Sequence, residues 1–362
     1  MSTHRSLRSR LLPLLALVLA LSARPAPAQQ TPGTVTGQVL DAASGAPIPL
    51  SLVYLLAPGG ADGPLLRTVT DQGGAFRFDG VPAGSYRLRV ERMGYTALPS
   101  EAFQVQGGET ARQVLRTAFT PVEIEGITVA GNACYTLDRL SQAPDLAALW
   151  GEAQKALETR RSFQEQYRYR FDIHVEGLAR MRLLRDQRTV KDSTVVSDPD
   201  SVRARAARAR EGGYGKQHGT SVSIRVPSET ELLSDGFLRD HCLEGDPGGA
   251  ADGRWTLNFR PVHPAEDRMD LRGTLVLDTA SFRVRELNYD YVQGNRTMGR
   301  ATLVFGDVST PLGVIRLPVS GRLRGDAGGM LGLVLQDFSG TIAFRGYRDF
   351  QRVGGGSAAA SR

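Results

Sequence analysis

TDQGGAFRFDGVPAGSYRLRV, residues 70–90, alternates apolar and polar side chains in two short runs separated by a tight corner. Phe76 and Phe78 share one face of the first run, and Tyr86, Leu88 and Val90 share one face of the second. Such a period of two is typical of half-buried strands. Gly and Pro in the intervening corner and in the preceding DQGG favour turns. The stretch therefore predicts two strands joined by a tight corner, with their aromatic rings facing a core.

The same pattern continues on both sides, over residues 34–119. Strands are indicated by TVTGQVLD (34–41) and by IPLSLVYLL (48–56), where Ile48, Leu50, Leu52 and Tyr54 are expected on one face. Six or seven short strands separated by turns of this kind predict a β-sandwich. In such a fold the glycines and aromatic residues have structural roles.

These residues resemble the carboxypeptidase regulatory-like domain, a transthyretin-like, carbohydrate-binding-like sandwich. The resemblance rests on the turns and core positions of GQVLDAASGAPIPLSLVYL (37–55) and TDQGGAFRFDGVPAGSYRLRVERMGY (70–95). It implies an accessory domain without catalytic groups, found beside peptidases, receptors and envelope proteins. The following TPVEIEGITVAG (120–131) is similar to the link after such a domain in TonB-dependent receptors, but no plug and large barrel follow. We expect an edge strand over Ile124–Val129 and a linker over 120–140.

The first 28 residues predict a signal peptide. A basic start precedes an apolar run over Leu11–Leu21, and Ala26-Pro-Ala28 matches a small-residue cleavage site, so cleavage is expected after Ala28. Four arginines leave with this segment, and the formal charge falls from +6 to +2. A nearly balanced surface does not attract nucleic acid, and no later apolar run is long enough for a transmembrane helix. Localisation in the periplasm or at the outer membrane is expected.

A second domain is predicted over residues 141–350. Leu146, Leu149, Trp150, Ala153 and Leu157 have the spacing of an amphipathic helix over about 145–160, with Ser141 or Asp145 as its cap.

Strand patterns follow the helix. Tyr167 to Ile173 alternate, and the region from Leu271 onward reads as an antiparallel meander, with a change of parity between Val284 and Leu287 that indicates a β-bulge. One helix and a curved sheet resemble the half-barrel of periplasmic lipoprotein carriers. Arginine-rich residues 186–220 predict a solvated arm, with contact to an acidic partner or a lipid headgroup as the alternative. Residues 351–362 predict a disordered tail.

Cys134 and Cys242 are the two cysteines of the chain. In an exported protein such a pair is expected to form a disulfide, with free thiols as the alternative. The chain also resembles a group of envelope proteins in which a regulatory-like domain precedes a cysteine, a helix with Leu149-Trp150 and Glu152-Ala153, and a later His-Cys, here His241-Cys242. That resemblance implies the Cys134–Cys242 bridge and assigns no activity.

No catalytic, cofactor-binding or metal-binding motif is predicted. The histidines are scattered, Asp240 and His241 are adjacent and would point to opposite sides of a strand, and His263 with Asp267 is a weak alternative pair. The loop GDPGGAADG (245–253) is too irregular for a calcium site. Three hypotheses remain. The first is a non-catalytic envelope protein that binds a polysaccharide, a lipid or a protein. The second is an enzyme or a peptidase or receptor accessory. The third is a periplasmic lipid or lipoprotein carrier.

Overall fold

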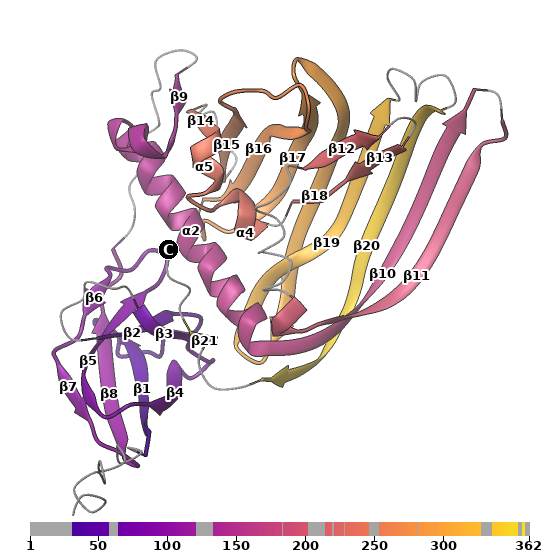
Figure 1. The fold of residues 1–362 in the computed structure, drawn as a ribbon. Helices are drawn as coiled ribbons and strands as arrows, with labels where there is room; N and C mark the ends of the chain where they lie inside the picture. The colour runs from indigo at the N-terminus through magenta and orange to yellow at the C-terminus, as the bar shows by residue number, and fades with distance from the viewer. Residues whose placement is uncertain are drawn as a thin grey trace, which may run out of the picture.

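The computed structural model describes residues 31–57, 64–120, 133–182, 184–201, 214–218, 221–227, 229–245, 253–279, 281–326, 335–353 and 357–358. The predicted signal peptide, the strand Ile124–Val129 and most of the loop 245–253 lie outside these residues. The chain forms an N-terminal β-sandwich, a long helix and a large antiparallel sheet that curves around the helix (Figure 1). This is the mainly β architecture that the sequence predicted.

The sandwich consists of two sheets with the predicted aromatic core between them. One sheet has the order β4 (Ala75–Val81), β1 (Gly33–Asp41), β8 (Thr110–Thr117). The other has the order β21 (Ser357–Ala358), β3 (Pro64–Val69), β2 (Leu52–Leu56), β5 (Gly84–Glu91), β6 (Leu98–Pro99), with β7 (Phe103–Val105) also paired to β5. Phe76, Phe78, Tyr86 and Leu88 are buried in one cluster, as expected from their alternation.

Strand β2 is buried on both faces, which differs from the one-sided strand predicted over 48–56. Val53 and Leu55 face the sandwich core, whereas Leu52 and Tyr54 belong to a second cluster with residues of the helix and the large sheet. The strand begins only at Leu52, and Leu50 before it has a φ of 57°. The continuous apolar run of IPLSLVYLL therefore reflects a sheet that is covered on its outer side by the second domain.

Helix α2 spans Pro144–Gln166 and follows the short 3-10 helix η1 (Leu137–Gln142). The five predicted apolar positions are all buried. The predicted caps are wrong: the N-cap is Ala143 without a side-chain hydrogen bond, and Pro144 opens the helix with a φ already suited to it. The helix also continues beyond residue 160, because its polar last turns are buried against the sandwich.

A buried ion-pair network joins these last turns to β3. The guanidinium of Arg67, 5% exposed, contacts Glu158 and donates a hydrogen bond to Glu165 at 2.6 Å. Thr68 donates to Gln166 at 3.2 Å. Burial raises the pKa of Glu165, but the ion pairs with Arg67 and Arg161 outweigh this effect and the pKa lies below its usual value. The polar residues of the helix thus dock the two domains.

The large sheet has ten strands. Their spatial order is β11 (Gln187–Ser197), β10 (Tyr167–Met181), β20 (Leu335–Arg352), β19 (Gly313–Asp326), β18 (Arg296–Thr310), β17 (Val284–Gln293), β16 (Asp270–Asp278), β15 (Arg254–Pro261), β14 (His241–Gly245), β9 (Cys134–Tyr135). All neighbouring strands are antiparallel. The predicted meander is confirmed, and the predicted bulge lies between Val284 and Glu286, where the register with β16 shifts.

Three parts of the chain differ from their predictions. Residues 187–197, expected in a solvated arm, form β11; the pattern is hidden because nearly every residue of this edge strand is exposed. Cys134 and Tyr135, expected in the linker, form β9 of the large sheet. Ser357 and Ala358, expected in a disordered tail, pair with β3, and β20 continues to Arg352. The two-stranded sheet β12 (Gly215–His218) and β13 (Ser221–Ile224) and the short helices α4 (Glu229–Leu232) and α5 (Phe237–Asp240) complete the described elements.

Candidate functional site on the concave sheet face

An apolar row crosses the large sheet on the side that faces α2. The strand register places its members opposite one another in turn, from β15 to β10: Leu257, Leu275, Leu287, Leu303, Gly321, Ile342, Val175. Opposed residues on neighbouring strands present their side chains on the same face. The four leucines belong to the core cluster that contains α2, so this side of the curved sheet is the concave, helix-bearing side (Figure 1).

The row is buried from β15 to β18 and becomes partly exposed at β20 and β10. Leu257, Leu275 and Leu287 are fully buried and Leu303 is 9% exposed, whereas Ile342 and Val175 are only half-buried. Phe171 and Phe344 lie beside them with ring centroids 6.2 Å apart, and both are half-buried as well. The concave face therefore continues as a partly exposed apolar floor over β20 and β10.

Aromatic rings border this floor where α2 ends and β10 begins. Phe163 at the end of α2 stacks on Tyr167 at 5.0 Å and on Tyr169 at 5.7 Å between ring centroids, and Tyr347 stacks on Phe171 at 5.2 Å. The hydroxyl of Tyr347 donates to the carbonyl of Pro318 at 2.6 Å, so its polar end is satisfied while its ring stays apolar. A chain of packed aromatic rings therefore connects the end of α2 with the floor.

Two glycines shape the middle of the floor. A Cβ on Gly321 would lie 2.9 Å from Ile342 Cγ2, and one on Gly325 would lie 2.4 Å from Phe338 Cζ. Their lack of side chains lets the apolar groups of β20 lie over β19. Register shifts in the pairs β17–β18, β18–β19 and β10–β20 add bulges, which increase the bending of the strands. Glycines and bulges together account for the curvature.

The opposite face of the same strands is charged. Asp172 accepts hydrogen bonds from Arg348 at 2.7 Å and from Thr194 at 2.7 Å, and these contacts hold the pKa of its carboxyl at about 2. His174 pairs with Asp192 at 2.7 Å and with Glu176 at 3.2 Å, which raises its pKa. The strands thus separate an apolar concave side from an ionic convex side.

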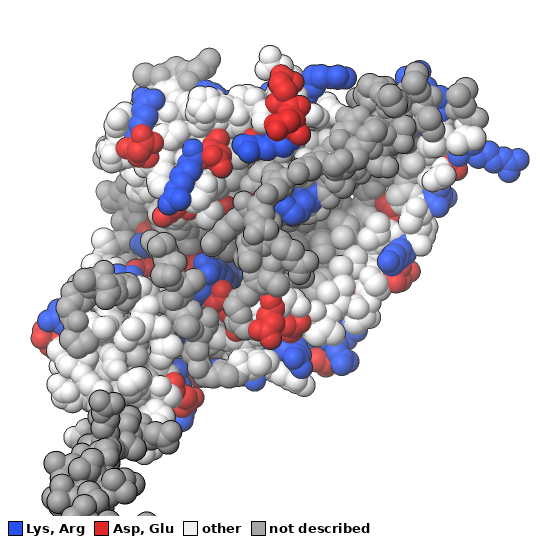
Figure 2. Space-filling model, in the orientation of Figure 1, with Lys and Arg blue, Asp and Glu red and all other residues white. Residues whose placement is uncertain are grey.

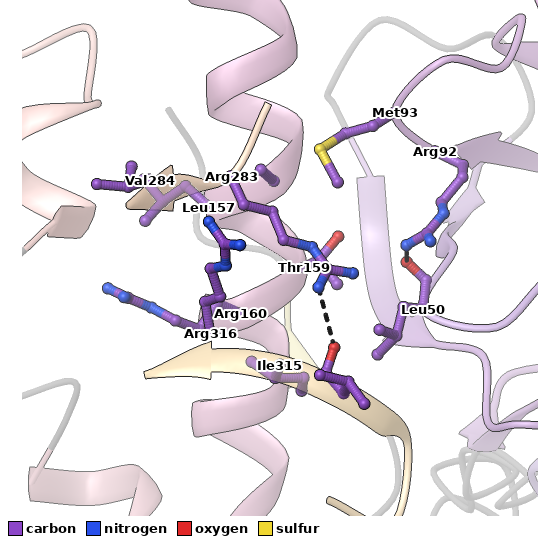
Figure 3. Close-up of a pocket in the computed structure, with 12 residues that line it drawn as sticks. Leu50, Arg92, Met93, Leu157, Thr159, Arg160, Arg283, Val284, Ile315 and Arg316 are labelled. Carbon is purple, nitrogen blue, oxygen red and sulfur yellow. Dashed lines mark hydrogen bonds between the residues drawn. The ribbon is translucent and has the colours of Figure 1, made fainter. Parts of the chain in front are cut away.

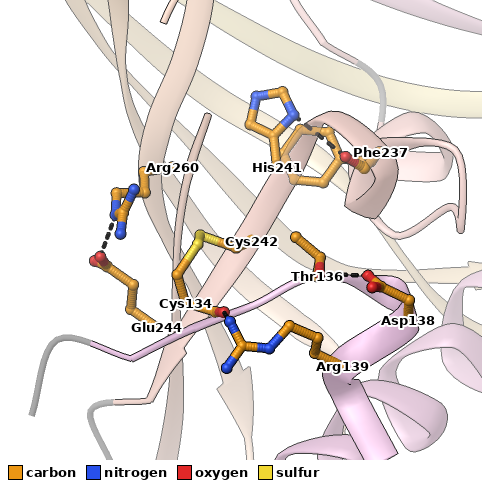
Figure 4. The surroundings of a disulfide bond; sticks show 9 residues. All are labelled: Cys134, Thr136, Asp138, Arg139, Phe237, His241, Cys242, Glu244 and Arg260. Atoms are coloured by element: carbon orange, nitrogen blue, oxygen red, sulfur yellow. Dashed lines mark hydrogen bonds and ion pairs between the residues drawn. A yellow bond between two sulfur atoms is a disulfide. The ribbon is translucent and has the colours of Figure 1, made fainter. Parts of the chain in front are cut away.

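The disulfide lies at the other end of the sheet. Cys134 and Cys242 are bonded, as predicted, with their Cα atoms 5.2 Å apart (Figure 4). Around the bridge, Arg139 donates to the carbonyl of Cys134 at 3.5 Å, and Arg260 pairs with Glu244 (Figure 4). The bond therefore fixes the entry to η1 and α2 against the last strands of the sheet.

The histidines do not form the pairs considered from the sequence. His241 is 1% exposed, stacks on Phe237 at 3.9 Å between centroids, and has Nε2 3.0 Å from Asp270 Oδ1. Its carboxylate partner is thus not the adjacent Asp240. His263 and Asp267 are exposed, and no hydrogen bond or ion pair joins them within the described ranges. His241 is packed where a substrate has no access.

Charged side chains of both signs are spread over the rest of the described molecule. Positive and negative side chains are interspersed on the face shown in Figure 2, with no large area of one sign among the residues coloured there. No group of three or more His, Cys, Asp or Glu side chains suited to a metal ion occurs in the part of the chain that the structure describes. Within that same part, no helix has the length and apolarity needed to cross a membrane.

The sequence did not identify the floor as a unit. Phe171, Ile173 and the strand TIAFRGY (341–347) alternate visibly, but their convergence depends on β10 joining β20 across most of the chain. The alternation of apolar and charged residues in these long strands was the available signal.

Comparison with known proteins identifies the sandwich. Residues 34–132 match the carboxypeptidase regulatory-like domain. The match agrees with the resemblance seen in the sequence and extends over less than a third of the chain. No curated protein sequence matches the chain.

Solved structures share only limited similarity. The LolA superfamily protein NE2245 of Nitrosomonas europaea has 12% identity and a TM-score of 0.24, covering 54% of this chain and 94% of its own. A DUF3823 family protein of Bacteroides uniformis has 12% identity and a TM-score of 0.21, covering 73% and 99%. The minor pilin GBS52 of Streptococcus agalactiae has 16% identity and a TM-score of 0.22, covering 26% and 46%, so the chain spans less than half of the pilin. Scores this low do not establish a shared whole-chain fold.

Proposed function

We propose that this protein is a non-catalytic, exported envelope protein that binds the apolar chain of a lipid on the concave face of its large sheet. The observation that carries the proposal is the row from Leu257 to Val175, which passes from a helix-covered core to a half-exposed floor on β20 and β10. Curved sheets with apolar concave faces suit ligands of this kind. The regulatory-like domain and the disulfide support an accessory protein of an oxidising, extracytoplasmic compartment.

Strands β10 and β20 carry apolar side chains on the concave face and charged side chains on the convex face. This arrangement favours a lipid over the other partners that the sequence left open. A polysaccharide needs hydrogen-bonding groups on the binding face, but the floor offers Phe171, Val175, Ile342 and Phe344, while the charged groups lie on the convex side. Carbohydrate and protein partners are therefore the alternatives that failure of the lipid test would favour.

The experiment compares two neighbours on β20. Ile342→Gln places an amide on the floor, whereas Thr341→Gln changes the next residue, which is exposed and faces the convex side. We expect purified protein to bind a fluorescent fatty acid, Ile342→Gln to weaken binding about 10-fold or more, and Thr341→Gln to leave it unchanged, since a buried methylene group contributes about 0.8 kcal/mol. Equal binding by all three proteins, or no lipid in an organic extract of the native protein, would contradict the proposal.

A further inference from the structure

A small cavity lies where the sandwich, helix α2 and the large sheet meet. It has a volume of about 30 Å³. Four arginines line it: Arg92 follows β5, Arg160 is on α2, Arg283 precedes β17 and Arg316 is on β19 (Figure 3). None of the described residues that line it is acidic. The cavity thus collects positive charge from both domains.

The polar contacts of Arg92, Arg283 and Arg316 leave much of the donor capacity of these three side chains unused. Arg92 Nη1 donates to the carbonyl of Leu50 at 3.0 Å, and Arg283 Nη1 donates to the carbonyl of Val314 at 3.3 Å. Arg316 Nε pairs with Asp307 at 2.9 Å, but its Nη1 is buried and has no hydrogen-bond partner among the described residues. A guanidinium offers five N–H donors, so one or two contacts do not saturate it.

Burial, and for Arg92 and Arg283 a neighbouring arginine as well, disfavour the charged form of these side chains. Arg160 is only 8% exposed, with its guanidinium 5.4 Å from the centre of the Phe305 ring. Burial lowers the pKa of Arg160 to about 10. Burial and the nearby Arg283 lower the pKa of Arg92 to about 10 as well. Burial also lowers the pKa of Arg283; the charge of Asp307 opposes this effect, the charge of Arg316 adds to it, and Asp278 opposes it more weakly. At neutral pH all four side chains still carry their charge.

We infer that this cavity binds a small oxyanion of the phosphate type, held by hydrogen bonds from Arg92, Arg283 and Arg316. The guanidinium fork matches the oxygen spacing of phosphate and forms short, charge-assisted hydrogen bonds with it. The cavity is too small for a sugar or a whole lipid but admits one such group. This site is separate from the apolar floor and does not depend on the function proposed for it.

The anion would also link the two domains. Arg92 belongs to the sandwich, whereas Arg283 and Arg316 belong to the large sheet. A ligand that binds only the folded, docked arrangement stabilises it by mass action. Occupancy of the cavity is therefore expected to raise the thermal stability of the whole chain.

The test measures the thermal midpoint of the full-length protein in sodium phosphate and in sodium chloride of equal ionic strength. We expect phosphate at roughly 30 times its Kd to raise the midpoint by about 2–5 °C. Arg283→Met and, independently, Arg92→Met are expected to abolish this rise. Arg285→Met is the matched control, because Arg285 is exposed, pairs with Asp278 and does not line the cavity.

Two further arms complete the experiment. Binding to vesicles of phosphatidylglycerol and of phosphatidylcholine distinguishes a lipid headgroup from free phosphate. If the protein binds only the phosphatidylglycerol vesicles, and Arg283→Met abolishes this binding, the oxyanion of the site is the phosphate of a lipid headgroup. Ile342→Gln should keep the phosphate response, which separates this site from the floor. No response to phosphate or to phosphatidylglycerol, or an equal response in wild type, Arg283→Met and Arg92→Met, would overturn the inference. Where a variant fails to fold, calorimetric titration of the wild type with inorganic phosphate decides.

Discussion

At the scale of single residues, Arg67 links the sandwich to helix α2 through buried ion pairs. It is buried between Glu158 and Glu165, and those two carboxylates also contact Arg161. Removing one member of a buried ion pair leaves the other charged groups in a poorly solvated place. The network therefore contributes more through the cost of breaking it than through its net attraction.

Arg67→Met is expected to destabilise the protein by about 3–5 kcal/mol, because it leaves buried Glu165 without its principal partner. Equilibrium unfolding in urea measures this change. The control is Arg77→Met, which removes an exposed pair with Asp79 and should cost far less stability than Arg67→Met. Equal losses in both variants would show that the network does not stabilise the docked state.

His174 makes part of the stability dependent on pH. Asp192 of β11 and Glu176 of β10 both contact its ring, and Arg345 of β20 lies in the same shallow hollow. Its folded-state pKa is raised from 6.5, so the stabilisation is fully present below pH 6.5 and is lost as the pH rises through the higher folded-state value.

His174→Gln should therefore lower the urea midpoint at pH 5 and leave it nearly unchanged at pH 9. The exposed His263 offers the comparison His263→Gln, which should have only a small effect on stability. A larger loss for His174→Gln at pH 9 than at pH 5 would reverse the sign and refute the assignment.

At the scale of elements, the curvature of the large sheet depends on glycines whose neighbours occupy the missing side-chain positions. Gly325→Ala would place a Cβ 2.4 Å from Phe338 Cζ and 2.7 Å from the carbonyl oxygen of Met298. Relieving such overlap in a packed sheet costs about 1–3 kcal/mol. Gly177→Ala on β10 is the control, because its nearest atoms lie at 3.9 Å. Thermal denaturation should rank Gly325→Ala clearly below Gly177→Ala, and equal midpoints would be inconsistent with this account.

The disulfide joins two cysteines that lie 108 positions apart in the sequence. In the chain-entropy model a closed loop of this length contributes about 4–5 kcal/mol. Cys242→Ser should lower the thermal midpoint markedly, Cys134→Ser should do the same, and the double variant should be no worse than either. Titration of the denatured, unreduced protein should find no free thiol; two free thiols would exclude the bond in solution.

The sequence was informative wherever one face of an element meets a core. The alternation around Phe76 and Phe78, the helix positions from Leu146 to Leu157 and the bulge near Val284 were all predictable for that reason. The last turns of α2 were not, since Glu165 and Gln166 are buried only because Arg67 and Thr68 come from another domain. The floor was missed because the pairing of β10 with β20 joins distant segments, and periodicity in one strand does not specify its partner.

At the scale of the whole molecule, the second domain covers an apolar outer face of the sandwich. Leu52, Tyr54 and Val69 on its outer face are at most 5% exposed because they pack against the second domain. A fragment of residues 31–120 should expose this apolar surface and bind the dye ANS more strongly than the full chain does. In that fragment Leu52→Thr should reduce dye binding, and a fragment with no excess binding would indicate that the sandwich is self-contained.

The bridge between Cys134 and Cys242 also determines how the molecule carries mechanical load. Under tension applied to the two ends, force passes directly from residue 134 to residue 242, and the intervening segment, which includes α2, β10 and β11, is not stretched. That segment would otherwise extend by about 370 Å. Helix α2 and strands β10 and β11 thus carry no tension, whereas the sandwich and the strands from β15 to β20 do. Reduction of the disulfide would place the whole segment between the two cysteines under tension.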